Sequence, residues 1–332
     1  MGLCSATITY MSIISNCTES AIKEAATSLI NGNLVAFPTE TVYGLGADAT
    51  NEKAVARLYE VKGRPTDHPL IVHILSIDHL DKWAKDIPEY AIKLARSFWP
   101  GPLTLILPRT ELAKDFITGD QNNVGIRVPA HTLALSLLKE FENQGGYGVA
   151  APSANRFGAV SPTTSRDVEI ELGDYLSRED LIIDGGPSLV GVESTIIDCT
   201  QSSPRISRPG GITKGMIEQI LVDTIISDYD NLFINKIKAP GLMESHYSPR
   251  ANVFLSGKPN RGDGLIALSN VKTPKGVQRL ASPINNEQFA QQLYGALRSA
   301  DEKNLQNVYV VPPSGNDIAV AINDRLMKAS QK

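Results

Sequence analysis

The sequence is poor in the residues that build disulfides and metal sites. It has three cysteines, Cys4, Cys17 and Cys199, and no two of them have the C-x-x-C spacing of a metal site. An odd count argues against a disulfide framework, and a reducing, cytoplasmic setting is the simplest interpretation. Residues 1–15 lack the basic start and the clear small-residue cleavage site of a signal peptide. We therefore expect a cytoplasmic protein.

The sequence also lacks long apolar runs, net positive charge and a P-loop. No apolar run approaches the roughly 18 residues that span a bilayer. The formal net charge is −4, so the whole chain has no electrostatic attraction to nucleic acid or to an acidic membrane. The pattern G-x-x-x-x-G-K-[ST] is absent, which excludes a P-loop enzyme. A bound anion would need a local cluster of basic residues.

The chain has the length and composition of two globular domains. It has 332 residues, of which 42% are apolar. Strands that alternate with helices predict an α/β domain over residues 15–222, and neighbouring strands without an intervening helix predict a mixed sheet. Residues 223–250 are interpreted as an ordered linker. The alternation then restarts and predicts a smaller, Rossmann-like α/β domain over residues 251–332.

The apolar periodicity also locates the elements. Thr18 or Ser20 is expected to cap the first helix, and Gly32 to end it. Helices are predicted over residues 21–30, from Thr50-Asn51 to Lys62, and over 88–99, 287–298 and 318–328. Strands are predicted over 34–37, 70–74, 103–107, 124–128, 148–151, 181–183, 195–197, 252–255, 264–268 and 307–311.

The most informative stretch, residues 37–64, contains parts that bind anions. Gly44-Leu45-Gly46-Ala47-Asp48-Ala49 fits the dinucleotide pattern G-x-G-x-x-A. Pro38 and the polar Thr39-Glu40-Thr41 separate the preceding strand from the first glycine, so the tight turn of that fingerprint is misplaced. We therefore expect no nicotinamide cofactor. The two glycines are interpreted as letting the backbone pass close to a bound group.

Lys62 and Arg64 follow the second predicted helix and allow two interpretations. They could be a basic C-cap that offsets the helix dipole. They could also form a rigid fork for a phosphate chain, because Gly63 permits a sharp turn and Pro65 and Pro69 stiffen the segment that carries His68.

Further polar residues lie at or inside predicted strands. Ser153 and Asn155 follow a strand, either as an ordinary turn or as ligand-binding groups at the strand end. Arg127 lies within an apolar strand and needs an anionic partner, which could be a structural carboxylate or a ligand carboxylate. His73 lies in another apolar strand, where a lone histidine is usually structural. Ser161 could add another hydroxyl.

Several motifs in one order carry a family resemblance. The segment 38–46, the fork Lys62-Gly63-Arg64, then Arg127-Val128-Pro129, Ser153-Ala154-Asn155, Glu193-Ser194-Thr195-Ile196 and Arg208-Pro209-Gly210 resemble the YrdC/Sua5 family of threonylcarbamoyl-AMP synthases over about residues 15–215. The linker ending in His246-Tyr247-Ser248-Pro249, the second domain and Ala321-Ile322-Asn323-Asp324-Arg325-Leu326 resemble the longer, Sua5-type members.

The resemblance implies a fold and an activity. The fold would be a twisted α/β sheet with a concave, positively charged cavity. The activity would be that of a nucleotidyltransferase that makes threonylcarbamoyl-AMP and pyrophosphate from L-threonine, bicarbonate or CO2, and ATP, for the t6A modification of tRNA. Mg2+ would arrive with ATP and be held mainly by phosphates and water, without a protein metal site. Lys62 and Arg64 would act in catalysis.

The resemblance also assigns binding residues. The ATP site would comprise Lys62, Arg64, His68, Asn123, Ala151, Ser153, Asn155, Ser161, Arg208 and Tyr247, with Tyr247 closing over it. The threonine site would comprise Thr41, His73, Arg127, Ser153 and Ser194. The expected partners are the three substrates and the downstream threonylcarbamoyl transferase complex, without a membrane and without stable tRNA binding.

Two other functions fit a concave basic surface. One is a module that binds double-stranded RNA. Residues 251–332 carry 10 Lys and Arg against 6 Asp and Glu, which leaves about −8 for the rest of the chain and argues against an extended phosphate footprint. The other is a transferase or hydrolase that acts on a carbamoyl-adenylate made elsewhere. The sequence assigns no role to the second domain.

Overall fold

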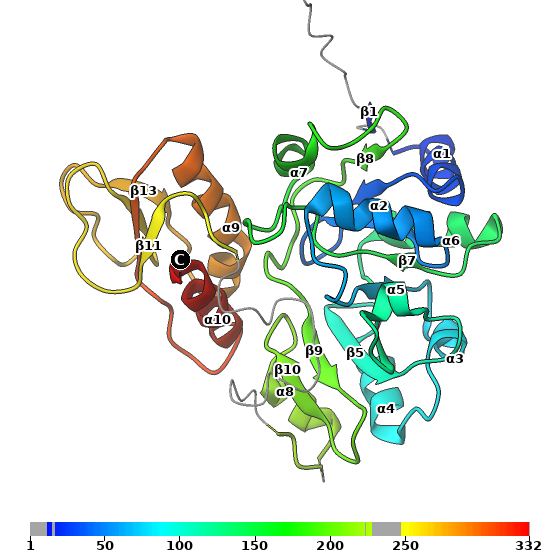
Figure 1. The fold of residues 1–332 in the computed structure, drawn as a ribbon. Helices are drawn as coiled ribbons and strands as arrows, with labels where there is room; N and C mark the ends of the chain where they lie inside the picture. The colour runs from blue at the N-terminus through cyan, green and yellow to red at the C-terminus, as the bar shows by residue number, and fades with distance from the viewer. Residues whose placement is uncertain (1–11, 15–16, 223, 228–246, 332) are drawn as a thin grey trace, which may run out of the picture.

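The chain folds into two α/β units, each with its own sheet. The computed structural model describes residues 12–14, 17–222, 224–227 and 247–331. Within these residues, one sheet has ten strands and the other has four. Figure 1 shows the large sheet and its helices on one side of the molecule, and the small sheet with two helices on the other. The predicted α/β class with a smaller second unit is confirmed.

The large sheet is mixed, as the sequence predicts. Strand β5 runs parallel to β9 and antiparallel to β6. In spatial order, the described strands are β1 (Ser12–Ile14), β8 (Leu181–Ile183), β2 (Val35–Phe37), β3 (Gly44–Asp48), β7 (Val149–Ala150), β4 (Ile71–His73), β6 (Asn123–Arg127), β5 (Leu103–Pro108), β9 (Thr195–Asp198) and β10 (Arg205–Arg208).

Helices cover both faces of this sheet because side chains alternate along each strand. Phe37 lies in the apolar cluster that contains the buried side chains of α1 and α6, whereas its neighbour Ala36 lies in the cluster that contains those of α2 and α4. The described helices of the large unit are α1 (Glu19–Ile30), α2 (Glu52–Lys62), η1 (Ile77–His79), α3 (Leu80–Trp83), α4 (Glu89–Phe98), α5 (Asp115–Thr118), α6 (Thr132–Asn143), α7 (Ser165–Leu172) and α8 (Lys214–Ile220).

Local sequence signals fix the ends of α1 and α2. The Thr18 side chain accepts a hydrogen bond from the backbone N–H of Ala21 and caps α1, as predicted. Asn51 caps α2 by accepting from two backbone N–H groups. Gly63 ends α2 in the left-handed conformation, with φ of 60°, so the chain turns sharply between Lys62 and Arg64.

The glycine-rich stretch forms a strand and no dinucleotide turn. Gly44–Asp48 is strand β3 and pairs antiparallel with β2. The interpretation of both glycines as room for a ligand is wrong for Gly46. A Cβ at Gly46 would lie 2.8 Å from a Val149 side-chain carbon and 2.9 Å from the Phe37 ring, so its small size serves sheet packing. Gly44 does line the pocket described below.

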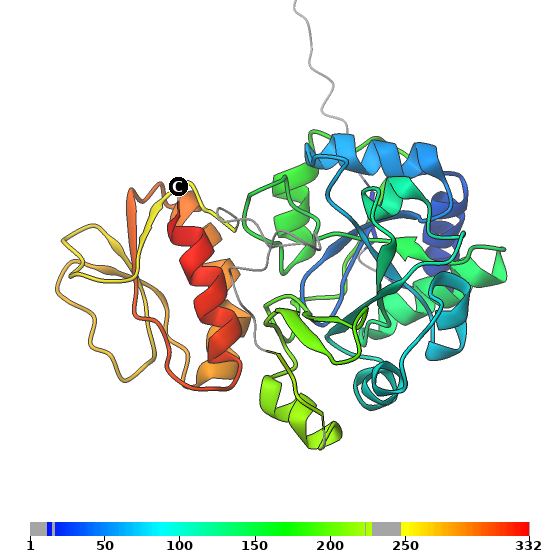
Figure 2. The same cartoon turned by 60° about the horizontal axis from the view of Figure 1, so that its bottom comes forward.

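The small unit has the parallel sheet that a Rossmann-like rhythm predicts. Its spatial order is β11 (Asn252–Phe254), β14 (Asn307–Val310), β12 (Gly264–Ile266) and β13 (Gln278–Ala281), and all described pairings are parallel. Helices α9 (Asn286–Glu302) and α10 (Ala319–Ser330) belong to it. Figures 1 and 2 show both helices on the side of the small sheet that faces the large unit.

Most of the predicted linker lies outside the described residues, which resume at Tyr247. Its bounds, 223–250, and those of the two flanking domains therefore stay predictions. Among the described helices, none has the length and apolar character needed to cross a membrane.

Candidate functional site

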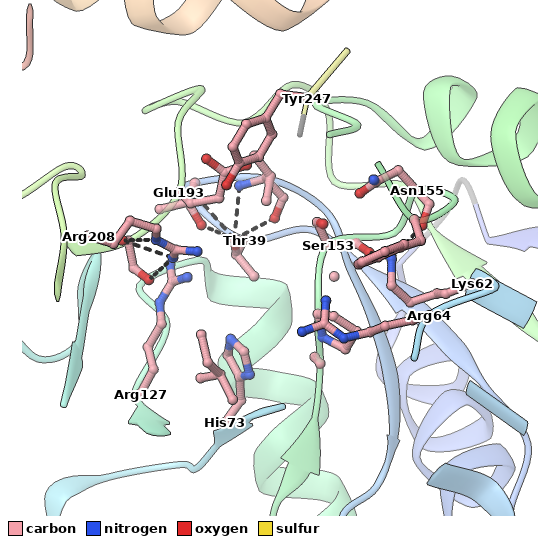
Figure 3. Close-up of a pocket in the computed structure, with 18 residues that line it drawn as sticks. Thr39, Lys62, Arg64, His73, Arg127, Ser153, Asn155, Glu193, Arg208 and Tyr247 are labelled. Atoms are coloured by element: carbon pink, nitrogen blue, oxygen red, sulfur yellow. Dashed lines mark hydrogen bonds between the residues drawn. The ribbon is translucent and has the colours of Figure 1, made fainter. Parts of the chain in front are cut away.

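A pocket in the large unit collects side chains from distant parts of the chain. It lies where β2, β3, β4, β6 and the loop after β7 come together, beside the residues that precede β9 and the end of β10 (Figure 3). Four basic side chains line it, and Glu193 is the acidic one in the lining. The lining residues are Thr39, Thr41, Val42, Gly44, Lys62, Arg64, Ile71, His73, Arg127, Ala151, Pro152, Ser153, Asn155, Phe157, Glu193, Ser194, Arg208 and Tyr247.

Lys62 is held by main-chain carbonyls of the loop after β7. Its ammonium group donates to the carbonyl of Ser153 at 2.6 Å and to that of Asn155. In return, the backbone N–H of Phe157 donates to the Lys62 carbonyl at 2.8 Å. Because both of these side-chain hydrogen bonds go to that loop, Lys62 is not a simple cap of its own helix. Burial, reinforced by the nearby Arg64 charge, lowers the Lys62 pKa well below its usual value.

Arg64 lies beside Lys62 and is also buried. Its Nη2 donates to the Pro69 carbonyl at 3.0 Å, and its guanidinium lies 5.9 Å from the centre of the Phe157 ring. Burial lowers the Arg64 pKa to about 10, and Arg208 adds to that effect. Two buried cations this close oppose each other, so an anion placed between them would relieve an unfavourable interaction.

Ser153 and Asn155 lie on a loop that is fixed to β3. The Leu45 N–H donates to the Pro152 carbonyl at 2.9 Å, and the Ala154 N–H donates to the Tyr43 carbonyl at 2.8 Å. The Asn155 amide group donates to the Arg156 and Ala159 carbonyls, at 2.7 and 2.9 Å. Its buried Oδ1 has no hydrogen-bond partner among the described residues. That oxygen is an acceptor available to a ligand donor.

Arg127 has a structural carboxylate partner. Its Nη2 donates to Glu40 Oε1 at 2.6 Å, and Glu40 Oε2 accepts from the Ala130 N–H at 2.9 Å. Of the two partners that the sequence leaves open, the structure therefore contains the structural one. Because both side chains are buried, the pair fixes the guanidinium at the pocket wall.

His73 is a neutral, buried imidazole at the same wall. It pairs with Arg127 across β4 and β6, and its ring lies edge-on to Phe37 with centroids 6.0 Å apart. Burial, together with the Arg127 charge, lowers the His73 pKa to about 3. Its Nδ1 has no hydrogen-bond partner among the described residues. His73 can therefore accept or donate one hydrogen bond to a ligand without carrying charge.

Ser194 and Arg208 lie on the same side of the pocket as Arg127, across from Lys62 and Arg64 (Figure 3). Arg208 donates to the Ser194 carbonyl from Nε at 3.1 Å and from Nη2 at 3.0 Å, and to Ser194 Oγ at 3.1 Å. Ser194 Oγ also lies 2.8 Å from Thr104 Oγ1. Gly210 allows the turn after β10 to approach the 193–195 backbone, because a Cβ there would lie 2.3 Å from the Thr195 nitrogen.

Tyr247, where the described residues resume, also lines the pocket. It is buried, with a left-handed φ of 61°. Its ring stacks on Tyr294 of α9 with centroids 5.7 Å apart, and the Arg325 guanidinium of α10 lies 5.3 Å from its ring centre. Two residues of the small unit, Tyr294 and Arg325, therefore pack against the Tyr247 ring.

Eleven of the fourteen predicted site residues line this one pocket, and three do not. Ser161 is buried nearby and donates to Glu193 at 2.7 Å. The His68 ring packs against Phe157 with centroids 5.4 Å apart. Asn123 begins β6, opposite Pro108. The eleven are Thr41, Lys62, Arg64, His73, Arg127, Ala151, Ser153, Asn155, Ser194, Arg208 and Tyr247. Their individual binding roles stay predictions.

The pocket is also lined by residues that were not predicted as site residues, among them Thr39, Glu193 and Phe157. Thr39 and Glu193 belong to the motifs 38–46 and 193–196, so their positions close to Thr41 and Ser194 were the available signal. Phe157 follows the Ser153-Ala154-Asn155 motif by two residues and had no comparable signal. Among the described residues, no group of three or more His, Cys, Asp or Glu side chains could hold a metal ion.

Two family models cover most of the chain. Residues 27–210 match the Sua5, YciO and YrdC family, described as "Telomere recombination". Residues 212–331 match the family described as "Threonylcarbamoyl-AMP synthase, C-terminal domain".

Similar proteins span nearly the whole chain. The chain is 40% identical to a threonylcarbamoyl-AMP synthase of Pyrococcus abyssi, over 96% of this chain and 98% of that protein. It is 39% identical to one of Bacillus subtilis, over 94% and 93%. The solved structure of P. abyssi Sua5 with L-threonine superposes with a TM-score of 0.86, at 37% identity over 97% of this chain and 98% of that one. The chain belongs to the Sua5 branch of the Sua5, YciO and YrdC family.

Proposed function

We propose that this protein is a threonylcarbamoyl-AMP synthase that uses L-threonine, bicarbonate or CO2, and ATP. The observation that carries the proposal is the convergence of four buried cations on one pocket, with Lys62 and Arg64 on one side and Arg127 and Arg208 on the other (Figure 3). Such a pocket can hold a polyanion on one side and a small zwitterion on the other. The full-length likeness to synthases supports this assignment.

The proposed reaction needs a positioned nucleophile and charge stabilisation. The threonine amine adds to CO2 and loses a proton, which gives a carbamate. A carbamate oxygen attacks the α-phosphorus of ATP, and the bond from that phosphorus to the bridging oxygen of pyrophosphate breaks. The carbamate is itself the nucleophile, so the protein has to align the reactants and stabilise the leaving pyrophosphate.

The pocket residues divide between these tasks. Lys62, Arg64 and Arg208 are placed to neutralise the triphosphate, and each charge-assisted bond contributes about 1.5–3 kcal/mol. Mg2+ enters as part of the ATP substrate, held by phosphate oxygens and water. The unpaired Oδ1 of Asn155 accepts a hydrogen bond from the nucleotide, and Arg127 with Ser194 receives the threonine. Tyr247 excludes water from the labile mixed anhydride.

The buried location of the cations favours this reaction over binding of double-stranded RNA. A phosphate footprint for RNA needs basic side chains on an exposed surface. Lys62, Arg64, Arg127 and Arg208 are instead between 2% and 8% exposed. The product is expected to pass to a threonylcarbamoyl transferase that acts on tRNA in the cytoplasm.

A turnover assay tests the proposal. The purified chain is incubated with ATP, Mg2+, L-threonine and bicarbonate, and pyrophosphate release is measured together with the mass of the nucleotide product. Formation of threonylcarbamoyl-AMP that requires all three substrates is the expected result. Pyrophosphate release that is independent of threonine would overturn the assignment.

A further inference from the structure

Glu193 is a pocket residue whose carboxylate is held largely from the small unit. Its Oε2 accepts from Arg325 Nε at 2.7 Å and from the Tyr294 hydroxyl at 2.9 Å. Its Oε1 lies 3.1 Å from the same hydroxyl and accepts from Ser161 Oγ at 2.7 Å. Tyr294 belongs to α9 and Arg325 to α10, the two helices that face the large unit in Figures 1 and 2.

Arg325 contacts three separate segments of the pocket wall. Besides Glu193, it donates from Nη2 to the Pro209 carbonyl at 3.0 Å, and its guanidinium lies 5.3 Å from the centre of the Tyr247 ring. The side chain is fully buried, and its Nη1 donates to Asp324 on its own helix. One residue of the small unit therefore joins the segment before β9, the segment after β10 and Tyr247.

These segments carry or adjoin side chains that line the pocket. Glu193 directly precedes Ser194, and Pro209 directly follows Arg208. Arg208 in turn donates three hydrogen bonds to Ser194. The two contacts of Arg325 therefore hold both ends of the Ser194–Arg208 wall at once.

The Glu193 carboxylate depends on Arg325 for its ion pair. Burial by itself would raise the Glu193 pKa, but the charges of Arg325 and Arg208 lower it to about 2. Without Arg325, the buried Glu193 carboxylate would lose its ion-pair partner and remain beside Arg208. Arg208 would then be drawn toward Glu193 and away from the ligand.

We propose that Arg325, together with Tyr294, is a positioning residue through which the small unit holds the Ser194–Arg208 wall of the pocket in place, and with it the Arg208 guanidinium that binds the nucleotide. The small unit is then part of the site and not an appendage to it. The catalytic consequence rests on the proposed function, whereas the effect on the wall itself does not.

A second contact between the units provides a matched control. Arg298 of α9 donates to Glu171 at 3.2 Å and to the Val160 carbonyl. It thus joins the same two units with the same kinds of bond, but neither partner lines the pocket. Arg298→Met removes an interunit link of comparable chemistry without touching Glu193 or Pro209. If Arg325→Met acted only by loosening the contact between the two units, Arg298→Met would have the same effect.

The experiment compares the full-length chain with Arg325→Met, Arg298→Met and the double variant Glu193→Gln/Arg325→Met. Calorimetric ATP affinity is measured together with kcat and KM for ATP and threonine. Arg325→Met is expected to weaken ATP binding at least tenfold, and Arg298→Met less than threefold. The double variant removes both charges of the Glu193–Arg325 pair. It is expected to regain at least half of the loss in ATP affinity, counted on a logarithmic scale. Equal losses in Arg325→Met and Arg298→Met would overturn the proposal.

Hydrogen exchange separates this proposal from the proposed function. Without any substrate, Arg325→Met is expected to speed amide exchange in peptides covering 190–197 and 205–212, whereas Arg298→Met leaves both unchanged. Unchanged exchange in Arg325→Met would overturn the proposal even in an active enzyme. A wild-type chain that makes no product would overturn the proposed function and leave this comparison valid. If Arg325→Met does not fold, Arg325→Lys and Tyr294→Phe take its place, with the same peptides expected to exchange faster.

Discussion

The Lys62 ammonium group donates to the Ser153 carbonyl at 2.6 Å, and this bond joins the end of α2 to the loop after β7. It connects two motifs that lie 91 residues apart in the chain. The bond explains how a lysine with a lowered pKa is retained in a buried position, since two carbonyl dipoles partly replace its lost hydration. It also places the remaining ammonium hydrogen beside the pocket.

Replacement of Lys62 by Met is expected to lower kcat/KM for ATP-dependent product formation by about two to three orders of magnitude, as loss of one charge-stabilising donor does. The measurement is steady-state pyrophosphate release. Lys53→Met, on an exposed position of the same helix, serves as the control and should retain full activity. Near-normal turnover in Lys62→Met would remove Lys62 from the catalytic assignment.

Arg64→Ala is expected to produce a loss of similar size, and Arg64→Lys a smaller one, because lysine keeps the charge but not the planar fork. The comparison is made on ATP affinity and on kcat separately. An Arg64→Ala protein that binds and turns over ATP normally would show that the Arg64 fork has no part in binding the triphosphate.

Tyr247→Ala is expected to weaken nucleotide retention without unfolding the large unit, because it removes the ring that stacks on Tyr294 and lines the pocket. ATP dissociation is measured by stopped flow, and circular dichroism monitors the fold. Tyr247→Phe keeps the ring and should remain within a few-fold of the wild type. Unchanged ATP affinity in Tyr247→Ala would count against a closing role for this residue.

Glu40→Gln is expected to reduce the free energy of unfolding by about 3 kcal/mol, because it leaves Arg127 as a buried charge without its carboxylate. The KM for threonine should rise if Arg127 binds that substrate. Denaturant unfolding and threonine titrations provide the two readouts. Glu89→Gln, which breaks an exposed ion pair with Lys93, should change neither.

His73→Asn is expected to flatten the acid limb of the stability curve. The His73 pKa is about 3 in the folded protein, below its usual 6.5. Between these values the unfolded chain binds a proton that the folded chain does not, so stability is full above about pH 6.5 and falls as the pH drops toward 3. Urea unfolding at pH 8 and pH 5 tests this. An identical loss of stability in both proteins would contradict it.

The sequence predicted the site better than it predicted the sheet. Ser153 and Arg208 could be found because a hydroxyl or charged residue next to Pro is unusual at the end of an apolar strand, and Lys62 because it stands beside Gly63 at the end of a helix. Strand β3 was missed because Gly44 and Gly46 have low strand propensity, and only packing against Phe37 and Val149 makes glycine favourable there.

Two other features were not predicted, for different reasons. Helix α6 was not predicted, although its apolar residues Ala134, Leu137, Leu138 and Phe141 stand at helical spacing and are buried. The contact between Arg325 and Glu193 had no sequence signal at all. These residues are 132 positions apart, and an arginine in an amphipathic helix ordinarily faces solvent.

The most direct test of the account is product analysis by mass spectrometry after incubation of the full chain with ATP, Mg2+, L-threonine and 13C-bicarbonate. The account predicts a threonylcarbamoyl-AMP that carries the 13C label, in a one-to-one ratio with pyrophosphate, and its loss when any one substrate is omitted. AMP and pyrophosphate without the labelled adduct, or an adduct without the label, would contradict it.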